Sequence, residues 1–232
     1  MILNIYKEKG WTSFDVVAKL RSLLKTKKIG HAGTLDPLAE GVLIVLTDSD
    51  TKRQDEFMHM EKEYEADVVF GATSPTLDLE GPISFSDIEI TKYLKSKDLK
   101  KILLPILKNY TGEFEQTVPA YSAKKLGGKE LYKLARSGKL NVSDLPTKKV
   151  HVKSISLVRI FSTTKLNGGL DLPVVTLNIV CNSGFYVRSL ADALGKELGL
   201  GALTLRILRK RVGDFSVGGS RKIKDLITEA TL

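Results

Sequence analysis

Gly30-His31-Ala32-Gly33-Thr34-Leu35-Asp36-Pro37-Leu38-Ala39-Glu40-Gly41 precedes an unbroken apolar run that extends from Val42 to Leu46. The run is short enough to be a buried strand, which would anchor the stretch to a core. Pro37 disfavours helical backbone at Asp36, and the glycines permit sharp turns, so we expect Asp36 to be presented on a firmly held loop. An Asp before Pro is also typical of an ordinary turn, and this stretch alone names no reaction.

The charge of the chain is positive and unevenly distributed. Its 232 residues carry 36 Lys+Arg against 27 Asp+Glu, a net charge of +9. Residues 124–153 hold nine basic residues and two acids, residues 206–224 hold seven and one, and residues 55–90 hold ten acids and one lysine. Such a polarised, basic molecule is expected to bind a polyanion.

Cysteine and histidine usage argues against several classes of site. Cys181 is the single cysteine, which excludes an internal disulfide framework and Cys-based zinc clusters and fits a reducing compartment. The three histidines, His31, His59 and His151, show no metal-ligand spacing. No apolar stretch approaches the roughly 20 residues of a membrane span, and no secretory signal begins the chain, so we expect a soluble, cytoplasmic protein.

The hydrophobic patterning predicts a chain that combines strands and helices, which is typical of an α+β fold. Strands are predicted at residues 2–6, 42–46, 64–70, 113–118, 148–161, 173–182 and 203–217. Helices are predicted from Thr12 or Ser13 onward, at 48–58, as two short helices within 86–110, and at 129–137, 186–198 and 223–230. We expect one domain over residues 1–232, with an insertion at about 120–150 and no separate C-terminal domain.

Three residues admit a structural and a functional interpretation. Tyr64, at the start of a strand, is either a core or edge aromatic or a platform on which a base stacks. Asp78, in a turn-rich segment, is an Asx-turn residue by its position, and its functional alternative comes from the family resemblance described below. Arg188, where a strand meets a helix, either forms a structural ion pair or pairs with Asp36.

The insertion and the last strand are the candidate RNA-binding segments. Glycines 127 and 128 hinge a basic segment that would be either a surface hairpin or a flap over folded RNA, and its charge favours the flap. The candidates for RNA contact are Lys124, Lys125 and Lys129 in the flap and Arg209 and Arg211 in the strand.

Several blocks of the sequence, in order, closely resemble the TruB family of tRNA pseudouridine synthases. The catalytic motif of that family resembles the stretch from Gly30 to Gly41. The other matching blocks are Lys7…Gly10-Trp11-Thr12-Ser13, Lys62-Glu63-Tyr64, Gly71…Thr76-Leu77-Asp78-Leu79-Glu80-Gly81, Pro119-Ala120-Tyr121-Ser122-Ala123-Lys124-Lys125 and Gly184-Phe185-Tyr186-Val187-Arg188-Ser189-Leu190. The resemblance covers nearly the whole chain. It implies a pseudouridine synthase fold, which is an α+β fold with a central, mostly antiparallel mixed sheet flanked by helices and loops.

The resemblance also implies a reaction and a set of roles. The reaction would be the cofactor-free conversion of uridine 55 to pseudouridine in the T loop of tRNA, by a monomer that flips the target base out. Asp36 would be catalytic, and His31 would contact the RNA or fill space in the loop. The remaining implied roles are stacking by Tyr64, a pocket wall from Tyr186 and Ile207, pairing of Arg188 with Asp36, and support by Lys7 and Asp78.

The sequence departs from the family pattern at a few positions. Tyr6 and Glu8 stand where Asp and Pro are usual, Val118 replaces a proline, Ala193 an acid and Leu208 an arginine. None of these positions lies in the catalytic motif. They bear on RNA affinity rather than on the reaction, as does the expected lack of the family's usual C-terminal RNA-binding domain.

Two other functions remain open at this point. A non-catalytic tRNA-binding or RNA-folding module would share the charge distribution. An aspartate-dependent glycoside hydrolase would need a second carboxylate, which Glu40 could supply, although a basic surface does not suit a neutral sugar.

Overall fold

The structure is a computed structural model that describes residues 1–86, 96–166 and 170–231. The chain forms two compact units: unit 1 comprises Met1–Glu65, Val180–Ser183 and Arg206–Leu232, and unit 2 comprises Ala66–Ile179 and Gly184–Leu205. Strands β4 (Lys62–Phe70), β11 (Leu170–Cys181) and β12 (Ala202–Val212) have residues in both units. The single-domain organisation therefore stays a prediction.

Unit 1 is built around strand β3 (Glu40–Thr47), which contains the apolar run predicted to be buried. Its residues from Val42 to Leu46 are completely inaccessible to solvent, which confirms that prediction. The other elements of unit 1 are β1 (Ile2–Lys7), α1 (Ser13–Leu23), β2 (Ile29–Ala32), the 3₁₀ helix η1 (Asp48–Arg53), α2 (Gln54–His59), β13 (Phe215–Ser216), the 3₁₀ helix η3 (Val217–Gly219), β14 (Arg221–Lys222) and α7 (Ile223–Thr231).

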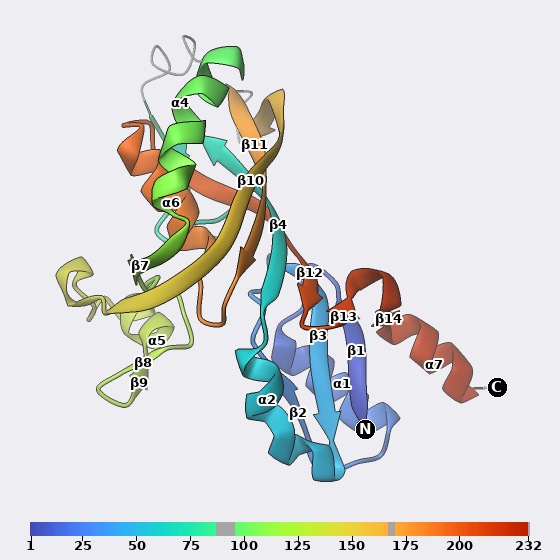
Figure 1. The fold of residues 1–232 in the computed structure, drawn as a ribbon. Helices are drawn as coiled ribbons and strands as arrows, with labels where there is room; N and C mark the ends of the chain where they lie inside the picture. Colours follow the sequence, from blue (N-terminus) through green and yellow to red (C-terminus); the bar gives the residue numbers. More distant parts are fainter. Residues whose placement is uncertain (87–95, 167–169, 232) are drawn as a thin grey trace. The chain divides into compact units, whose positions relative to one another are not determined.

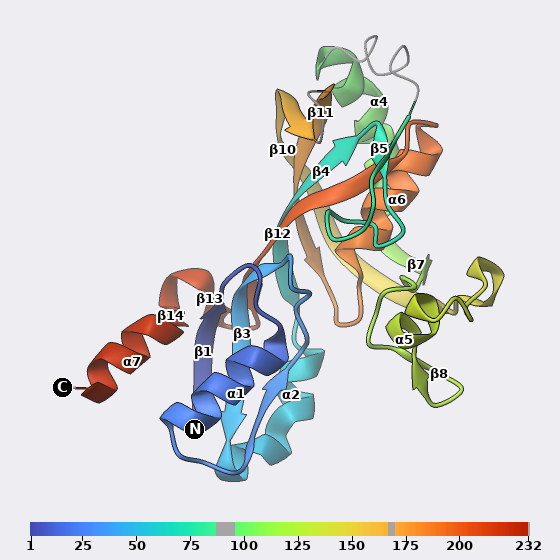
Figure 2. The ribbon, with the colours of Figure 1, turned by 180° about the vertical axis from the view of Figure 1, so that it is seen from behind.

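Hydrogen-bonded neighbours surround β3. Strands β1 and β2 pair with it in antiparallel fashion, and β12 pairs with it in parallel, with Arg209 opposite Gly41. Alternate residues of β3 face opposite sides: Leu43 and Val45 pack with α1 and α7, whereas Val42, Ile44 and Leu46 pack with Phe57 of α2. Figure 2 shows α1 and α2 beside β1, β2 and β3.

Helix α1 begins where the sequence predicts. Thr12 and Asp15 form a reciprocal capping box, in which the Asp15 amide donates to the Thr12 hydroxyl and the Thr12 amide donates to the Asp15 carboxylate. Val16 and Leu20 of this helix enter the core beside Ile5. The helix therefore holds the segment that precedes the Gly30–Gly41 stretch.

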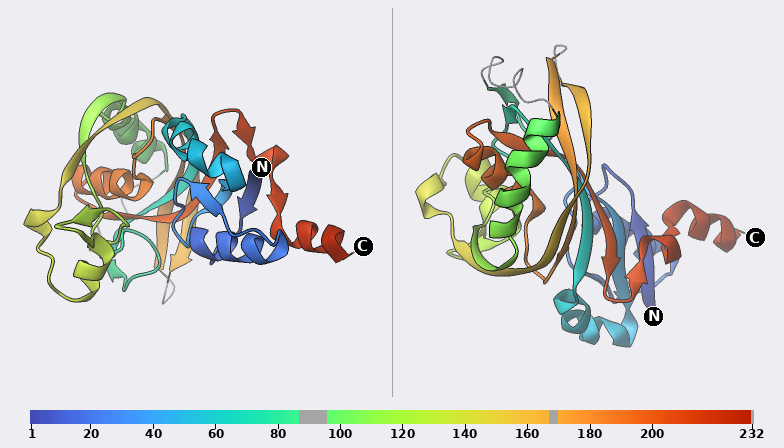
Figure 3. Two further views of the ribbon diagram at one scale, coloured as in Figure 1. Left: turned by 90° about the horizontal axis from the view of Figure 1, so that it is seen from below. Right: turned by 45° about the horizontal axis from the view of Figure 1, so that its top comes forward.

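In unit 2 the strand order is β12-β4-β11-β10-β7. Figure 1 shows α4 running beside β10, and Figure 3 shows β10 curving around α4 and α6. The remaining elements of unit 2 are β5 (Ala72–Thr73), β6 (Ser84–Phe85), α4 (Ser96–Asn109), β7 (Gly112–Thr117), β8 (Lys125–Leu126), β9 (Lys129–Glu130), α5 (Leu131–Arg136), the 3₁₀ helix η2 (Val142–Asp144), β10 (Thr147–Leu166) and α6 (Val187–Glu197).

The α+β class and the mixed, mostly antiparallel sheet are confirmed. The predicted strand at 203–217 is wrong at its end, because β12 stops at Val212 and Gly213, with a φ of +52°, turns the chain back into β13. Strand β2, which carries His31, was not predicted, because four residues with a glycine among them show too little alternation. Of the two helices predicted within 86–110, the described part is α4, which continues through Pro105, and residues 87–95 lie outside the described residues.

Candidate active site

Asp36 lies in the loop between β2 and β3, as the sequence predicts. The neighbouring side chains of Leu35 and Leu38 are each 4% exposed, whereas Asp36 is half-buried. The Ala39 amide donates to the Asp36 carbonyl at 3.0 Å and closes a turn. Gly33 has a φ of +97°, a conformation that side chains rarely adopt. The backbone of the loop is thus anchored by apolar residues on both sides of the carboxylate.

Lys7 supports this loop from the N-terminal segment. Its ammonium is fully buried and donates to the carbonyls of Trp11 at 2.7 Å, Glu8 at 3.2 Å and Pro37 at 3.4 Å. The Gly10 amide donates to the same Pro37 carbonyl at 2.8 Å. A buried ammonium is costly unless it is hydrogen-bonded, so these carbonyls and Lys7 hold one another in place.

Ser13 makes a second attachment, which the sequence did not single out. Its buried hydroxyl accepts from the Leu35 amide at 2.9 Å and lies 3.2 Å from the Leu35 carbonyl, to which it donates. Ser13 is the first residue of α1, so the helix and the loop are joined directly. The only signal in the sequence was its place in the Gly10–Ser13 block.

Arg209 is buried and not on the surface, so the prediction that it contacts RNA is wrong. Its side chain is 1% exposed. Its Nε donates to the Val42 carbonyl at 2.7 Å, Nη2 to Gly33 at 3.0 Å and Nη1 to Thr34 at 3.4 Å. The error has a physical reason: burial along β12 alternates, so that Ile207 and Arg209 are buried while Leu208 is half-buried, and composition alone does not reveal which face is covered.

Tyr64 lies in β4, and the charges of Asp36 and Arg209 both affect the pKa of its phenol. Burial raises the pKa of the Tyr64 phenol. The positive charge of Arg209 acts in the opposite direction, and the Asp36 carboxylate adds to the rise in pKa. The phenol is therefore neutral at pH 7. Ile207, 4% exposed, supplies an apolar side chain from β12 of the same unit.

His31 belongs to β2, opposite Val45 of β3. Burial lowers the pKa of its imidazole, and the positive charge of Arg209 lowers it further, so His31 is neutral at pH 7. Its Nδ1 is buried and has no hydrogen-bond partner among the residues that the structure describes. Its contact with RNA remains a prediction.

Glu40 is engaged on both carboxylate oxygens. The Tyr6 hydroxyl donates to one at 2.9 Å, and Arg206 Nε donates to the other at 2.9 Å. Burial raises the pKa of Tyr6 to about 12, and the bond to Glu40 adds to that rise. Because a paired carboxylate is poorly placed to act as a second acid or base, this geometry does not favour a glycoside hydrolase.

The remaining basic side chains of β12 also face acids. Arg206 bonds Glu65 as well as Glu40, Lys210 bonds Glu63, and Arg211 bonds Glu61 at 2.6 Å and Glu63 at 3.4 Å. The acidic and basic segments seen in the sequence therefore partly neutralise each other. The Arg211 side chain is 30% exposed, and its contact with RNA stays a prediction.

In unit 2, Arg188 is buried against Asp78. Arg188 Nη1 lies 3.6 Å from Asp78 Oδ2 and donates to the Thr76 carbonyl at 2.7 Å, and Nη2 donates to the Tyr121 carbonyl at 3.0 Å. Asp78 Oδ1 accepts from the Thr76 hydroxyl at 2.6 Å and from the Glu80 amide at 2.9 Å. Asp78 thus serves in an Asx turn and in a polar network together. Pairing of Arg188 with Asp36 stays a prediction.

Tyr186 is held by Gln116, a residue that sequence reasoning missed. The Tyr186 amide donates to Gln116 Oε1 at 2.8 Å, and Gln116 Nε2 donates to the Tyr186 carbonyl at 3.0 Å. Gln116 is 5% exposed in β7, and the alternation of Phe114, Gln116 and Val118 placed it on a covered face. That polar residue among apolar ones was the available signal.

The predicted flap is a small hairpin followed by a short helix. Strands β8 and β9 pair across Gly127 and Gly128, whose φ angles are +57° and +81°. The side chains of Lys124, Lys125 and Lys129 are exposed. Their exposure leaves them able to meet a phosphate backbone, and contact with RNA remains a prediction.

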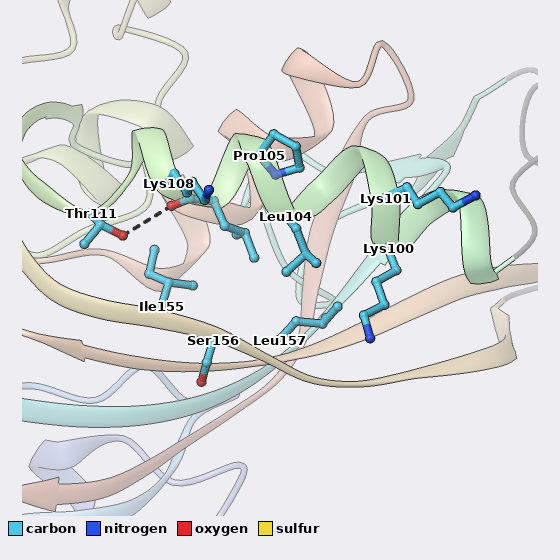
Figure 4. A pocket seen from close by; sticks show the side chains of 10 residues that line it. Lys100, Lys101, Leu104, Pro105, Lys108, Thr111, Ile155, Ser156 and Leu157 are labelled. Carbon is cyan, nitrogen blue, oxygen red and sulfur yellow. Dashed lines mark hydrogen bonds between the residues drawn. The ribbon is translucent and has the colours of Figure 1, made fainter.

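A cavity of about 660 Å³ lies between α4 and β10 in unit 2 (Figure 4). Its lining combines lysines with apolar and hydroxyl side chains and includes none of the predicted site residues. The lining residues are Lys100, Lys101, Leu104, Pro105, Leu107, Lys108, Thr111, Ile155, Ser156 and Leu157.

Neither a metal cluster nor a membrane-spanning helix is found in the part of the chain that the structure describes. Within residues 1–86, 96–166 and 170–231, no three His, Cys, Asp or Glu side chains gather as a possible metal site. Across the same ranges, no helix combines the length and apolar character needed to cross a bilayer.

Comparison with known proteins gives matches along nearly the full chain. Residues 21–187 match the family model described as TruB family pseudouridylate synthase, N-terminal domain. The chain is 38% identical over 222 residues to tRNA pseudouridine synthase B of Parabacteroides distasonis, which covers 93% of this chain and 87% of that protein. It is 37% identical to the protein of the same name from Clostridium kluyveri, covering 100% of this chain and 73% of that one.

A solved structure shows a similar fold. A chain from the crystal structure of a Cbf5-Nop10-Gar1 complex superposes with a TM-score of 0.67 at 24% identity, covering 98% of this chain and 53% of the other. The present chain thus spans about half the length of that protein. At this identity the similarity concerns the fold alone.

Proposed function

Because the chain belongs to the TruB family of pseudouridylate synthases, we propose that it isomerises uridine to pseudouridine in tRNA, at uridine 55 of the T loop. The observation that carries the proposal is the Asp36 carboxylate on its anchored loop, with the neutral phenol of Tyr64 in electrostatic reach. A carboxylate held this firmly suits catalysis, because even a small displacement of a reacting group lowers the reaction rate steeply.

The reaction leaves the atoms of the nucleotide unchanged in number. The bond between the ribose and N1 of uracil breaks, a bond from the ribose to C5 forms, C5 loses its proton to solvent and N1 gains one. The site must hold the detached base and keep water from the ribose. Asp36 is the proposed catalytic residue, acting on the ribose or on the base.

Access to the base requires that the nucleotide leave its stack in the T loop. Flipping the nucleotide costs a few kcal/mol of unstacking energy, which contacts in the pocket must offset. Tyr64 is proposed to stack on the flipped base, beside the apolar side chain of Ile207. His31, neutral at pH 7, would contact the RNA through hydrogen bonds rather than through charge.

Unit 2 supplies the other proposed contacts. Tyr186, held through its backbone by Gln116, would line the substrate pocket, and Arg188 would pair with Asp36. Asp78 would support Arg188 through their 3.6 Å ion pair. The proposed substrate-binding segments of the two units thus rest on buried polar partners.

Binding of the T stem-loop is proposed to use charge on the flap. Lys124, Lys125 and Lys129 are exposed, and Arg211 is a further candidate. Each phosphate neutralised would add nearly one unit to the slope of log affinity against log salt. We propose a monomer that acts in the cytoplasm.

The decisive experiment replaces Asp36 by Asn and measures pseudouridine in transcript tRNA. We expect binding within about threefold of wild type and a rate reduced at least about 1,000-fold, in line with the loss of an acid, base or nucleophile. Asp55→Asn, an exposed residue of α2, is the matched control and should retain the rate. An Asp36→Asn protein with normal rate would disprove the catalytic assignment.

The same samples distinguish an enzyme from a non-catalytic RNA-binding module. Release of tritium from C5 of labelled uridine requires that the carbon lose its hydrogen, so a non-catalytic tRNA-binding or RNA-folding module would release none. Mapping the modified position in the product tRNA then tests the assignment to uridine 55. Modification elsewhere would leave the reaction class standing and refute the site.

A further inference from the structure

Arg209 is a buried cation that donates hydrogen bonds to three backbone carbonyls. Its guanidinium is 1% exposed, and the three acceptors belong to Gly33, Thr34 and Val42. Removing a guanidinium from water costs several kcal/mol unless its donors are satisfied. A surface-stabilising role would not require that cost, because the next residue, Lys210, forms an ion pair with Glu63 while remaining partly exposed.

The three carbonyls bracket the catalytic loop. Gly33 and Thr34 precede Asp36 by three and two residues, and Val42 is in the strand that follows the loop. A planar guanidinium with donors in a fixed fork joins these points at fixed angles. Arg209 thereby links the strand after Asp36 to the segment before it.

The main chain of Arg209 is itself held tightly. Arg209 pairs with Gly41 in the parallel ladder between β12 and β3, and a Cβ on Gly41 would lie 2.3 Å from the Arg209 carbonyl oxygen. A Cβ on Gly33 would lie 3.6 Å from Arg209 Nη1, which is ordinary van der Waals contact. The close approach that requires glycine is therefore the one between Gly41 and the backbone of Arg209.

The charge of Arg209 shifts the pKa values of His31, Tyr64 and Lys62. It lowers the pKa of His31 in the same direction as burial does, and it opposes the rise that burial causes in the pKa of Tyr64. Burial, with the charge of Arg209 as the second cause, brings the pKa of Lys62 down to about 8. One side chain thus binds the carbonyls of the Asp36 loop and acts electrostatically on the ring proposed to meet the base.

We propose that Arg209 is a positioning residue, whose guanidinium holds the Gly33 and Thr34 carbonyls and so fixes where Asp36 lies relative to Tyr64. This inference rests on the proposed function. It differs from simple stabilisation of the fold, because displacement of a reacting group by about 1 Å lowers a rate by roughly 100-fold while the protein stays folded.

The first test is Arg209→Lys, which keeps the positive charge and loses the fork. Single-turnover formation of pseudouridine should fall roughly 100-fold, with the Kd for tRNA within about threefold of wild type. Arg53→Lys is the matched control, because Arg53 forms exposed ion pairs with Asp50 and Glu56 in unit 1. The control should keep its rate. Circular dichroism at the assay temperature verifies that each variant is folded.

The second test reads the charge without any activity. The chain has three histidines, so proton NMR resolves the titration of His31 beside those of His59 and His151. The pKa of His31 should rise in Arg209→Gln, which removes the charge, and stay near the wild-type value in Arg209→Lys. An unchanged His31 titration in Arg209→Gln would overturn the assigned place of the guanidinium.

Other outcomes also decide the matter. A wild-type rate in Arg209→Lys overturns the proposal, as does a loss of rate matched by an equal loss of tRNA affinity, which would mark a binding residue. Should both Arg209 variants unfold, Gly33→Ala strains the backbone at a φ of +97°, beside the carbonyl that Arg209 binds, and should lower the rate in the same way. A normal rate in that variant overturns the proposal. If the wild-type chain makes no pseudouridine, the proposed function fails, whereas the His31 titration still tests the placement of Arg209.

Discussion

Replacing Gly41 by Ala should damage the junction between β3 and β12 more than the same change at other glycines of unit 1. Gly41 has a φ of +106°, and an added Cβ would lie 2.3 Å from the carbonyl oxygen of Arg209 and 3.0 Å from its carbon and nitrogen. These are backbone atoms in a paired strand, so no flexible side chain can move aside.

The expected size follows from two contributions. A side chain in left-handed backbone costs roughly 1–2 kcal/mol. Overpacking that forces backbone to shift costs roughly 1–3 kcal/mol more, while the smaller entropy of the unfolded Ala chain returns about 0.5–1 kcal/mol. The net destabilisation is about 3 kcal/mol. In a domain of this size that corresponds to a fall in Tm of roughly 6–12 °C, at about 2–4 °C for each kcal/mol.

Two other glycines of unit 1 separate the cost of backbone strain from the cost of overpacking. Gly10 has a φ of +88° and nothing within 4 Å of an added Cβ, so Gly10→Ala carries the backbone strain alone and should cost about 1 kcal/mol. Gly30 lies in β2 with no positive φ and an equally open position. Gly30→Ala should be neutral or stabilising by about 0.5 kcal/mol.

The assay is urea unfolding of the three variants, followed by circular dichroism, with thermal midpoints as a second measure. From most to least stable, the expected order is Gly30→Ala, then Gly10→Ala, then Gly41→Ala. If Gly41→Ala proved as stable as Gly10→Ala, the close approach of β3 and β12 at this point would be refuted. The loss should also lower the rate, because Arg209 reaches the loop from that pair.

Three further predictions concern buried polar groups. Ser13→Ala leaves the Leu35 amide without its hydroxyl partner and should cost roughly 1–3 kcal/mol in urea unfolding, and a cost below about 0.5 kcal/mol would contradict this. Burial raises the pKa of Cys181 from 9.0 to about 12, so its contribution to stability is complete below pH 9 and declines above it by roughly 1.4 kcal/mol per pH unit. The stability difference between wild type and Cys181→Ala should show this slope between about pH 9 and 10.5, and a flat difference would count against it. Gln116→Ala removes both hydrogen bonds between the Gln116 side chain and the backbone of Tyr186, and should reduce the rate of pseudouridine formation about tenfold. Gln116→Glu keeps the acceptor and should give an intermediate rate. Equal rates in all three proteins would refute that role.

Much of the local structure follows from short-range patterns. The start of α1 at Ser13 and the buried run from Val42 to Leu46 were both predicted and are both present. Such signals depend on residues three or four apart, or on the composition of one strand, which a chain displays without tertiary contacts. Where the signal was weak, as in the four-residue β2 or past Gly213, the prediction failed.

The sequence by itself determined which carboxylate is presented, because Pro37, the glycines and the following strand constrain Asp36 locally. Only the tertiary structure decided what the cations do. Lys7 and Arg209 are buried and bind loop carbonyls, whereas Lys124 and Lys125 are exposed, although all four belong to segments whose composition does not tell them apart. The reason is physical: whether a cation is desolvated depends on which strands cover it, and Arg209 meets Gly33 and Val42 only after β12 has paired with β3 from the far end of the chain.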